Sequence, residues 1–472
     1  MELQKTLTDV LYGGGIRIAV RLRGLVFIPL ITGFLGVGAF GAYTQVLAVT
    51  SLGSLVFGLG LYKSLVRYGH RGDRVADRYI SLLCVSLASS LVATVALVAA
   101  ASWVAGVTLQ SEGYGDAYRI GAALILTRTV VRHARNYYRI DGRIKRYSLI
   151  EGLRAYAMIT AVTLTVVLTD TGLPGLFGGM VVVDCLIIVV LHALIAREIG
   201  LAVPTFRNLR QHLAYALPST WSTLASEITT RADRVLIGVF LGDVALGLYA
   251  VTAQIATGIS MYIMPIYQTF FPEFSRLLDE DRTETCAEYL EQGARDFLIL
   301  AIPSVGGLYL VGGDVVELLT QAAATPSPLL IVLVSTGTAF VGVEVIYGSL
   351  MDAAEETEYR ALYRTAGAVL NVGLNLLAIP RFGVVGAAGA TVVTTFVVAG
   401  LTIRRVRYLV STPLPWWTLL RCTGATLVLI WVDAALPSVP WLWTVLLSVP
   451  LYFAVLFLSR ELSVAELRAS VS

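Results

Sequence analysis

The feature that most constrains this chain is a series of apolar runs that recurs from one end of the sequence to the other. Each run is about 20 residues long, the length that a helix needs to cross the hydrocarbon core of a bilayer. In lipid, only α-helices and closed β-barrels satisfy every backbone polar group, and barrel strands would alternate apolar and polar residues, which these runs do not. The sequence therefore predicts an all-α polytopic membrane protein.

The composition agrees with this class. Of the 472 residues, 56% are hydrophobic and only 14% are charged, whereas a soluble chain carries about 25% charged residues. Such a chain cannot cover a water-exposed surface, so the bilayer must act as its solvent. We expect membrane lipid as a partner, no nucleic acid, and a monomer.

The apolar windows predict about fourteen transmembrane helices, and no connection between them is long enough to hold a soluble domain. The predicted spans are 14–34, 40–62, 80–105, 118–138, 148–168, 175–196, 213–240, 246–270, 295–312, 328–350, 362–379, 384–403, 417–434 and 441–459.

The charges of the connecting loops predict the orientation. The loop after the second span carries Lys63, Arg67, Arg71, Arg74 and Arg78, and every second loop after it is also basic, whereas the alternate loops carry mostly acidic residues. Basic loops stay in the cytoplasm. We therefore expect both termini to be cytoplasmic. The strong preference for arginine over lysine suggests a GC-rich prokaryotic genome. We expect the protein in the cytoplasmic membrane of a prokaryote.

Signatures of catalysis, cofactors and metals are missing from the sequence. The cysteines form no CxxC pair, the histidines have no metal-ligand spacing, and no acidic metal motif or large outer loop suggests an enzyme. Residues 36–41 match GxGxxG, but they join two apolar spans and lack the strand and acidic residue of a dinucleotide site. We expect no cofactor, no metal and no catalytic residue, and interpret these glycines as a tight turn.

Two glycine-containing motifs recur and predict an internal repeat. FLGVGAFGAY at 34–43 returns as FLGDVALGLY at 240–249, with an offset of 206 residues. Gly172, Gly175 and Gly178 return as Gly383, Gly386 and Gly389, with an offset of 211 residues. An even number of helices separates the copies, so both enter the membrane in the same direction.

This repeat predicts the domain organisation. Two six-helix lobes would be related by a pseudo-twofold axis along the membrane normal, as in transporters whose lobes rock around a central site. We expect an N-lobe at 1–202, a C-lobe at 203–408 and a terminal helix pair at 409–472.

Arginines inside the apolar spans are the candidate substrate ligands. A charge at the centre of a membrane helix costs about 2.5–3.5 kcal/mol, so such residues usually face a polar interior. Arg stays charged and binds phosphate through two parallel hydrogen bonds. We therefore predict a cationic cavity for an anionic head group; its candidate residues are Arg17, Arg21, Arg128, Arg132, Arg231 and Arg234.

Other interpretations of these charges remain open. The arginines of the first and fourth spans could reach the cytoplasmic interface as topology anchors, and Glu227 with Arg231 could be a structural pair. Four acids inside spans are weaker candidates for coupling to H⁺ or Na⁺, or could only neutralise an arginine. These are Asp184, Glu227, Asp233 and Glu344.

Three runs resemble a known family. GAYTQVLAVTSLGSLVFGLGLYKSLVRY at 41–68, RADRVLIGVFLGDVALGLYAVTAQI at 231–255 and VLNVGLNLLAIPRFGVVGAAGATVV at 369–393 are similar to the polysaccharide-export (Wzx-type) branch of the MOP superfamily. The resemblance implies a MATE-like fold of fourteen helices. It also implies that the chain is a flippase for polyprenyl-linked oligosaccharides and not an enzyme.

The resemblance also implies roles for single residues. In that family, arginines of the first helix and of the cavity wall engage the lipid-linked phosphate, and Arg17 and Arg21 match the former. Arg231 and Arg234 lie in the Asp-Arg motif of the seventh helix, while Arg128 is chosen for its depth alone. Because MATE drug exporters share the fold, a cation-coupled drug or metabolite antiporter is the alternative.

Overall fold

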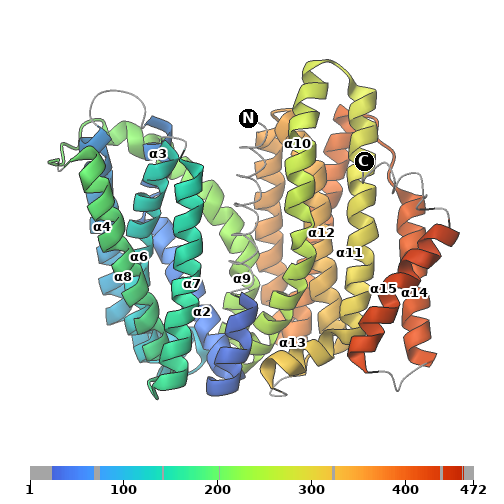
Figure 1. The fold of residues 1–472 in the computed structure, drawn as a ribbon, viewed down its shortest axis with the longest axis horizontal. Helices are drawn as coiled ribbons and strands as arrows, with labels where there is room; N and C mark the ends of the chain where they lie inside the picture. The colour runs from blue at the N-terminus through green and yellow to red at the C-terminus, as the bar shows by residue number, and fades with distance from the viewer. Residues whose placement is uncertain are drawn as a thin grey trace. The chain divides into compact units, whose positions relative to one another are not determined.

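The computed structural model describes residues 24–68, 75–140, 143–200, 202–321, 325–435, 440–459 and 461. In these ranges the secondary structure is helical, with no strand, and Figure 1 shows long helices throughout. The expected all-α class is confirmed. Arg17 and Arg21 lie outside the described residues.

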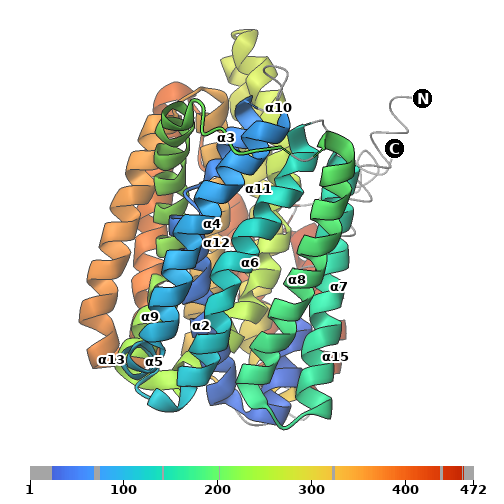
Figure 2. The ribbon, with the colours of Figure 1, turned by 90° about the vertical axis from the view of Figure 1, so that its left-hand side faces the viewer.

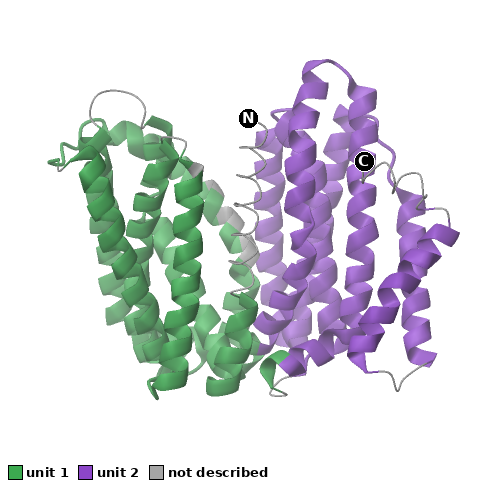
Figure 3. Cartoon of the chain, in the orientation of Figure 1, with its two compact units in different colours: residues 1–247, 319–323 green, residues 248–318, 324–472 purple. Residues whose placement is uncertain are grey.

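The helices form two compact units (Figure 3). Unit 1 comprises residues 1–247 and 319–323, and unit 2 comprises residues 248–318 and 324–472. The predicted lobe boundaries at 202 and 408 remain predictions.

Unit 1 is built around α6, which packs against α2, α3, α4, α5, α7 and α8. Figure 2 shows α4, α6, α8 and α7 across one face of this unit. The helices are Gly24–Leu35, α2 (Val37–Phe57), α3 (Leu61–Tyr68), α4 (Val75–Ala99), α5 (Ala101–Leu109), η1 (Glu112–Tyr114), α6 (Gly115–Ile140), α7 (Ile144–Leu168), α8 (Gly172–Ile199) and α9 (Leu209–Ala256), of which the last continues into unit 2.

Unit 2 is built around α12, which packs against α10 and α13. Its core holds Phe274, Phe297, Tyr347 and Met351, all nearly inaccessible to solvent. The helices are η2 (Thr257–Met261), α10 (Ile263–Asp279), α11 (Thr283–Thr320), α12 (Pro328–Ala353), α13 (Thr357–Leu409), α14 (Trp416–Ala435) and α15 (Trp441–Leu458).

The outer faces of these helices are apolar. On α8, for example, Leu186 is 63% exposed and Val189 is 67% exposed. Ten helices in the described part of the chain are long and apolar enough to cross a membrane. The structure thus supports a membrane-spanning protein, and the total of fourteen transmembrane helices remains a prediction.

The repeated motifs place glycine at breaks in the helices. Gly36, between Gly24–Leu35 and α2, has φ 89°, and its counterpart Gly242, inside α9, has φ 81°. Gly172 and Gly383, the other repeated pair, have φ 59° and 60°. Side chains rarely tolerate this left-handed backbone, so glycine allows the chain to turn between helices here.

The two copies of the first motif also pack against each other inside unit 1. A Cβ at Gly41 would lie 2.0 Å from the carbonyl oxygen of Asp243, and a Cβ at Gly247 would lie 2.1 Å from the carbonyl oxygen of Val37. Gly247 and Asp243 are the repeat counterparts of Gly41 and Val37. The contact is therefore reciprocal, and the glycines allow α2 and α9 to approach closely.

Candidate functional site

Two of the predicted arginines lie on one face of α6. Arg128 Nη1 donates to Ser51 Oγ at 2.8 Å, and Arg132 Nη2 donates to Ser54 Oγ at 3.2 Å. Arg132 also lies over the ring of Tyr62, 5.6 Å from its centroid. The i, i+4 spacing thus directs both guanidinium groups toward α2, where serines one turn apart receive them.

A third cation beside this row was missed by the sequence interpretation, which assigned Lys63 to a loop. Lys63 lies in α3, and its Nζ donates to the carbonyl oxygen of Ser219 at 2.8 Å, to Ser219 Oγ at 3.0 Å and to Thr223 Oγ1 at 2.6 Å. Lys63 also experiences the charge of Arg132. The helical position of Lys63 was not predicted, because a short basic helix directly after an apolar run has the same sequence pattern as a basic loop.

The fourth and fifth members lie on α9. Arg231 Nε donates to Glu227 Oε2 at 2.6 Å, and both side chains are about one-third exposed. Glu227 is close enough to attract Arg132 electrostatically. We define Lys63, Arg128, Arg132, Glu227 and Arg231 as the cationic cluster of unit 1.

The charge of this cluster is not balanced from within. Four of its members are basic and one is acidic, and the acid is paired with Arg231. Among the residues that the structure describes, no carboxylate forms an ion pair with Arg132 or Lys63; their partners are hydroxyl groups, a carbonyl oxygen and an aromatic ring. The cluster can therefore receive an anion.

The remaining predicted residues of α9 lie next to each other. Asp233 is buried and accepts a hydrogen bond at 2.7 Å from the backbone amide of Arg234, whose side chain is half-buried. The structure does not show Arg234 in contact with the cluster.

Asp184, a candidate for ion coupling, is held by an arginine. Its fully buried carboxylate accepts bonds from Arg154 Nε at 2.7 Å, from Arg154 Nη2 at 3.2 Å and from Thr127 Oγ1 at 3.2 Å. The pair joins α7 to α8. This geometry favours the interpretation that Asp184 neutralises an arginine.

Glu344 in unit 2 is held in the same way. Arg364 donates to both of its oxygens, at 3.2 and 3.0 Å, and Arg360 Nε donates to Oε1 at 3.4 Å. Arg360 also pairs with Asp352, which accepts a bond from Tyr267 at 3.3 Å. This network, in which Glu344 is buried and Arg364 is 43% exposed, links α12 to α13 and α10, and its charges balance internally.

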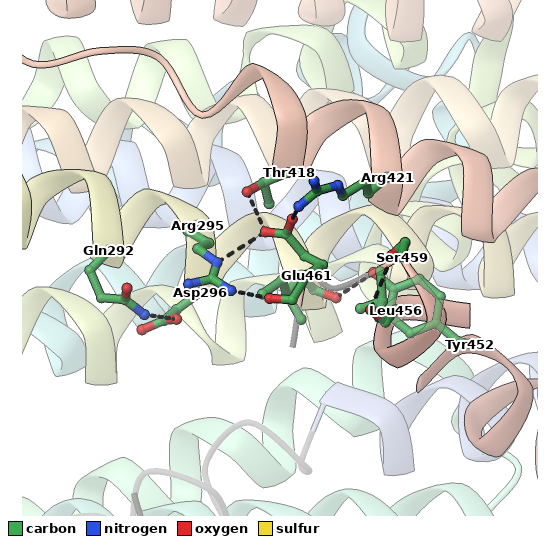
Figure 4. A network of polar contacts seen from close by, with 10 residues as sticks. Gln292, Arg295, Asp296, Thr418, Arg421, Tyr452, Leu456, Ser459 and Glu461 are labelled. Atoms are coloured by element: carbon green, nitrogen blue, oxygen red, sulfur yellow. Dashed lines mark hydrogen bonds and ion pairs between the residues drawn. The ribbon is translucent and has the colours of Figure 1, made fainter. Parts of the chain in front are cut away.

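A second carboxylate network in unit 2 was missed from the sequence (Figure 4). Glu461, 3% exposed, accepts bonds from Arg295 Nε at 3.0 Å, Thr418 Oγ1 at 2.5 Å and Arg421 Nη1 at 2.7 Å. Burial alone would raise the pKa of this carboxyl, but these hydrogen bonds outweigh it and hold the pKa below its usual range. Glu461 thereby ties the end of α15 to α11 and α14.

The long apolar helices and their buried charged networks define a polytopic helical membrane protein. The chain belongs to the polysaccharide biosynthesis protein family, whose model matches residues 30–322. It is 24% identical over 383 residues to the probable flippase AglR of Haloferax volcanii, an alignment that covers 80% of this chain and 78% of that protein. The resemblance to polysaccharide-export proteins is therefore confirmed.

Solved structures of a flippase and of a multidrug transporter resemble this fold. The lipid II flippase MurJ in an inward closed conformation matches with a TM-score of 0.80 at 15% identity, covering 94% of this chain and 99% of MurJ. An inward-facing multidrug resistance MATE transporter of the MOP superfamily matches with a TM-score of 0.71 at 15% identity, covering 84% of this chain and 98% of the transporter. The fold is thus MATE-like, and at this identity the match concerns the fold alone.

Proposed function

We propose that the chain is a flippase that moves a sugar or oligosaccharide, linked to a polyprenyl phosphate or pyrophosphate, across the cytoplasmic membrane. The observation that carries the proposal is the cationic cluster, in which no described carboxylate pairs with Arg132 or Lys63. Membership of the polysaccharide biosynthesis family supports it, as does the similarity to a probable flippase. The translocated sugar would serve cell-surface polysaccharide or glycoprotein biosynthesis.

The chemistry of the cluster suits a lipid-linked phosphate. A cation held away from water without a countercharge is costly, and an anionic ligand recovers that free energy. The guanidinium of Arg132 offers a planar pair of donors to phosphate oxygens, and Lys63 offers a compact charge. The hydroxyl of Ser54, which Arg132 contacts, is neutral, so a phosphate oxygen can replace it without leaving an unpaired charge.

The proposed topology has fourteen spans with both termini in the cytoplasm. The two longest apolar stretches, Arg231–Asp279 and Thr357–Leu409, have 49 and 53 residues, whereas one span needs about 20. Gly242 and Gly383 break these stretches in a left-handed conformation. Gly383 divides Thr357–Leu409 into two halves that can each cross the membrane. Gly242 separates 209–241 from 243–279, and each of these parts is long enough for one span.

The proposed mechanism is alternating access by a monomer with two related lobes, 1–202 and 203–408, and a terminal pair, 409–472. The matching conformations of the repeated glycines and the reciprocal packing of Gly41 and Gly247 support the repeat. Repeats of this kind allow one structure to open on either side of the membrane in turn.

A MATE-like antiporter driven by H⁺ or Na⁺ is the second candidate, favoured by the similarity of the fold to a multidrug transporter. Its cargo would be cationic and would need acidic residues available to bind it. Asp184 and Glu344 are occupied by arginines instead. If the flippase itself is ion-coupled, Glu227 is the best placed acid, because it is partly exposed and is the acidic member of the cluster.

The test is a measurement of lipid-linked sugars in a strain that lacks the gene, with the pools of the two membrane leaflets separated. We expect a carrier-linked sugar to accumulate in the cytoplasmic leaflet and the wild-type gene to relieve the accumulation. Unchanged pools together with new sensitivity to cationic drugs would contradict the proposal and favour the antiporter.

A further inference from the structure

Unit 1 contains an open cleft of about 450 Å³ at the side predicted to be cytoplasmic. The end of α3, the start of α4, the segment 205–208 and the first turn of α9 surround it. Ser81 Oγ accepts bonds from the backbone amides of Thr205 and Phe206, at 2.9 and 3.4 Å, and so attaches that segment to α4. The cleft is thus bounded by fixed elements, and its volume is that of a small-ligand site.

A nearly buried histidine ring lines this cleft with one nitrogen unused. His212 is 5% exposed, its ring packs edge-on against Tyr68, and its Nδ1 lies 2.5 Å from Ser64 Oγ. Within the described ranges of the chain, Nε2 has no hydrogen-bond partner. Because Nδ1 is engaged with Ser64, Nε2 is the ring nitrogen available to a group in the cleft.

The charges around the cleft favour an anion that also carries hydroxyl groups. Arg207 and Arg78 line it, and the first turn of α9 adds the partial positive charge of a helix N-terminus. Arg78 also donates to the carbonyl oxygen of Tyr68, which holds the arginine at the rim. The acid in the lining is Asp77, which suits the hydroxyl groups of a polyol.

We propose that this cleft binds a phosphate ester of a small polyol, such as a sugar phosphate or glycerol phosphate. Arg207 and the N-terminus of α9 receive the phosphate, His212 Nε2 contributes a hydrogen bond, and Asp77 accepts bonds from hydroxyl groups. The ester is either a soluble metabolite or the head group of a lipid. The site does not depend on the transported substrate, because it involves no residue of the cationic cluster.

Binding to the purified full-length protein tests the proposal, with two probes that separate the sources. Glycerol 3-phosphate is titrated against protein in detergent, and phosphatidylglycerol is compared with phosphatidylcholine in nanodiscs. We expect saturable binding of at least one phosphate probe. Arg207→Gln should weaken it about tenfold, the effect of losing one charge-assisted hydrogen bond.

Arg210→Gln is the matched control, because Arg210 is an exposed arginine of the same helix end that does not line the cleft. It should leave the affinity unchanged. Thr205→Trp should abolish binding without changing any charge, since the exposed Thr205 borders the cleft and the indole would fill it. No binding of either probe, or equal weakening by Arg207→Gln and Arg210→Gln, would overturn the proposal.

Discussion

Charged side chains have different partners in two regions, the Glu344 network of unit 2 and the cationic cluster of unit 1. In unit 2, Glu344 is flanked by Arg360 and Arg364, so each charge of that network has an opposite charge within reach. In unit 1, the side chains of Arg132 and Lys63 also contact neighbouring helices, but no described carboxylate forms an ion pair with either of them.

The difference separates charges that hold helices together from charges that can receive a ligand. In a buried ion pair each charge neutralises the other, and removing one partner leaves an unpaired buried charge that lowers the stability of the fold. A cation bound only to hydroxyl groups keeps its capacity for a stronger partner. Arginine therefore has a structural role in the Glu344 network and in the Arg154–Asp184 pair of unit 1, and a proposed binding role in the cationic cluster.

The largest effect on stability is expected from Glu344→Gln. The substitution leaves the largely buried Arg360 with Asp352 alone and the partly exposed Arg364 without its partner, and we expect the free energy of unfolding to fall by about 3 kcal/mol, the lower end for a broken buried pair. Thermal or denaturant unfolding of the purified protein in detergent measures this loss.

Glu273→Gln is the control for that experiment, because Glu273 pairs with Arg276 on an exposed part of α10 in the same unit. Exposed ion pairs contribute little to stability, so we expect no measurable change. Equal stability of both variants would show that the Glu344 network is not structural and would remove the contrast between this network and the cationic cluster.

A smaller, pH-dependent effect is expected at Glu461. Its pKa is held below the ordinary value of 4.5 because Thr418, Arg421 and Arg295 bond to the charged form. The resulting stabilisation is fully present above pH 4.5 and is lost as the pH falls through the lowered pKa of the folded state. As the pH is lowered from 7, the melting temperature of the wild type should therefore fall more steeply than that of Glu461→Gln. An equal fall in both proteins would contradict this.

The smallest stability effect is expected in unit 1. Replacing Lys63 by Met and Arg132 by Gln removes two cations that have neutral partners, so the free energy of unfolding should stay the same or rise by about 1 kcal/mol. Unfolding under the conditions used for Glu344→Gln provides the measurement. A loss as large as that of Glu344→Gln would mean that the cluster is structural.

The locations of the apolar helices and of the glycines that break them could be predicted from the sequence, because both depend only on neighbouring residues in the chain. Each predicted span that the structure describes lies largely in helix, although the span 40–62 crosses the break between α2 and α3. The repeated Gly36 and Gly242 share a left-handed backbone. The common face of Arg128 and Arg132 followed from helical periodicity alone.

Charge pairing could not be predicted, because it depends on contacts between helices. Nothing in the spacing indicated that Arg154 reaches Asp184 from another helix, or that Lys63 packs against α9. Glu461 lies in a polar segment after the last span, so its burial against α11 and α14 had no sequence signal. The position of a charge along its own helix can be read from the sequence, whereas the identity of its neutralising partner cannot.

The central claim is that the cationic cluster binds the phosphate of the transported lipid, and export in a deletion strain tests it most directly. The strain is complemented with Lys63→Met/Arg132→Gln or with Arg119→Gln, whose arginine forms an exposed pair with Asp116. At equal protein levels, we predict that the double variant leaves the lipid-linked sugar in the cytoplasmic leaflet and that Arg119→Gln restores export. Wild-type export by the double variant would contradict the account.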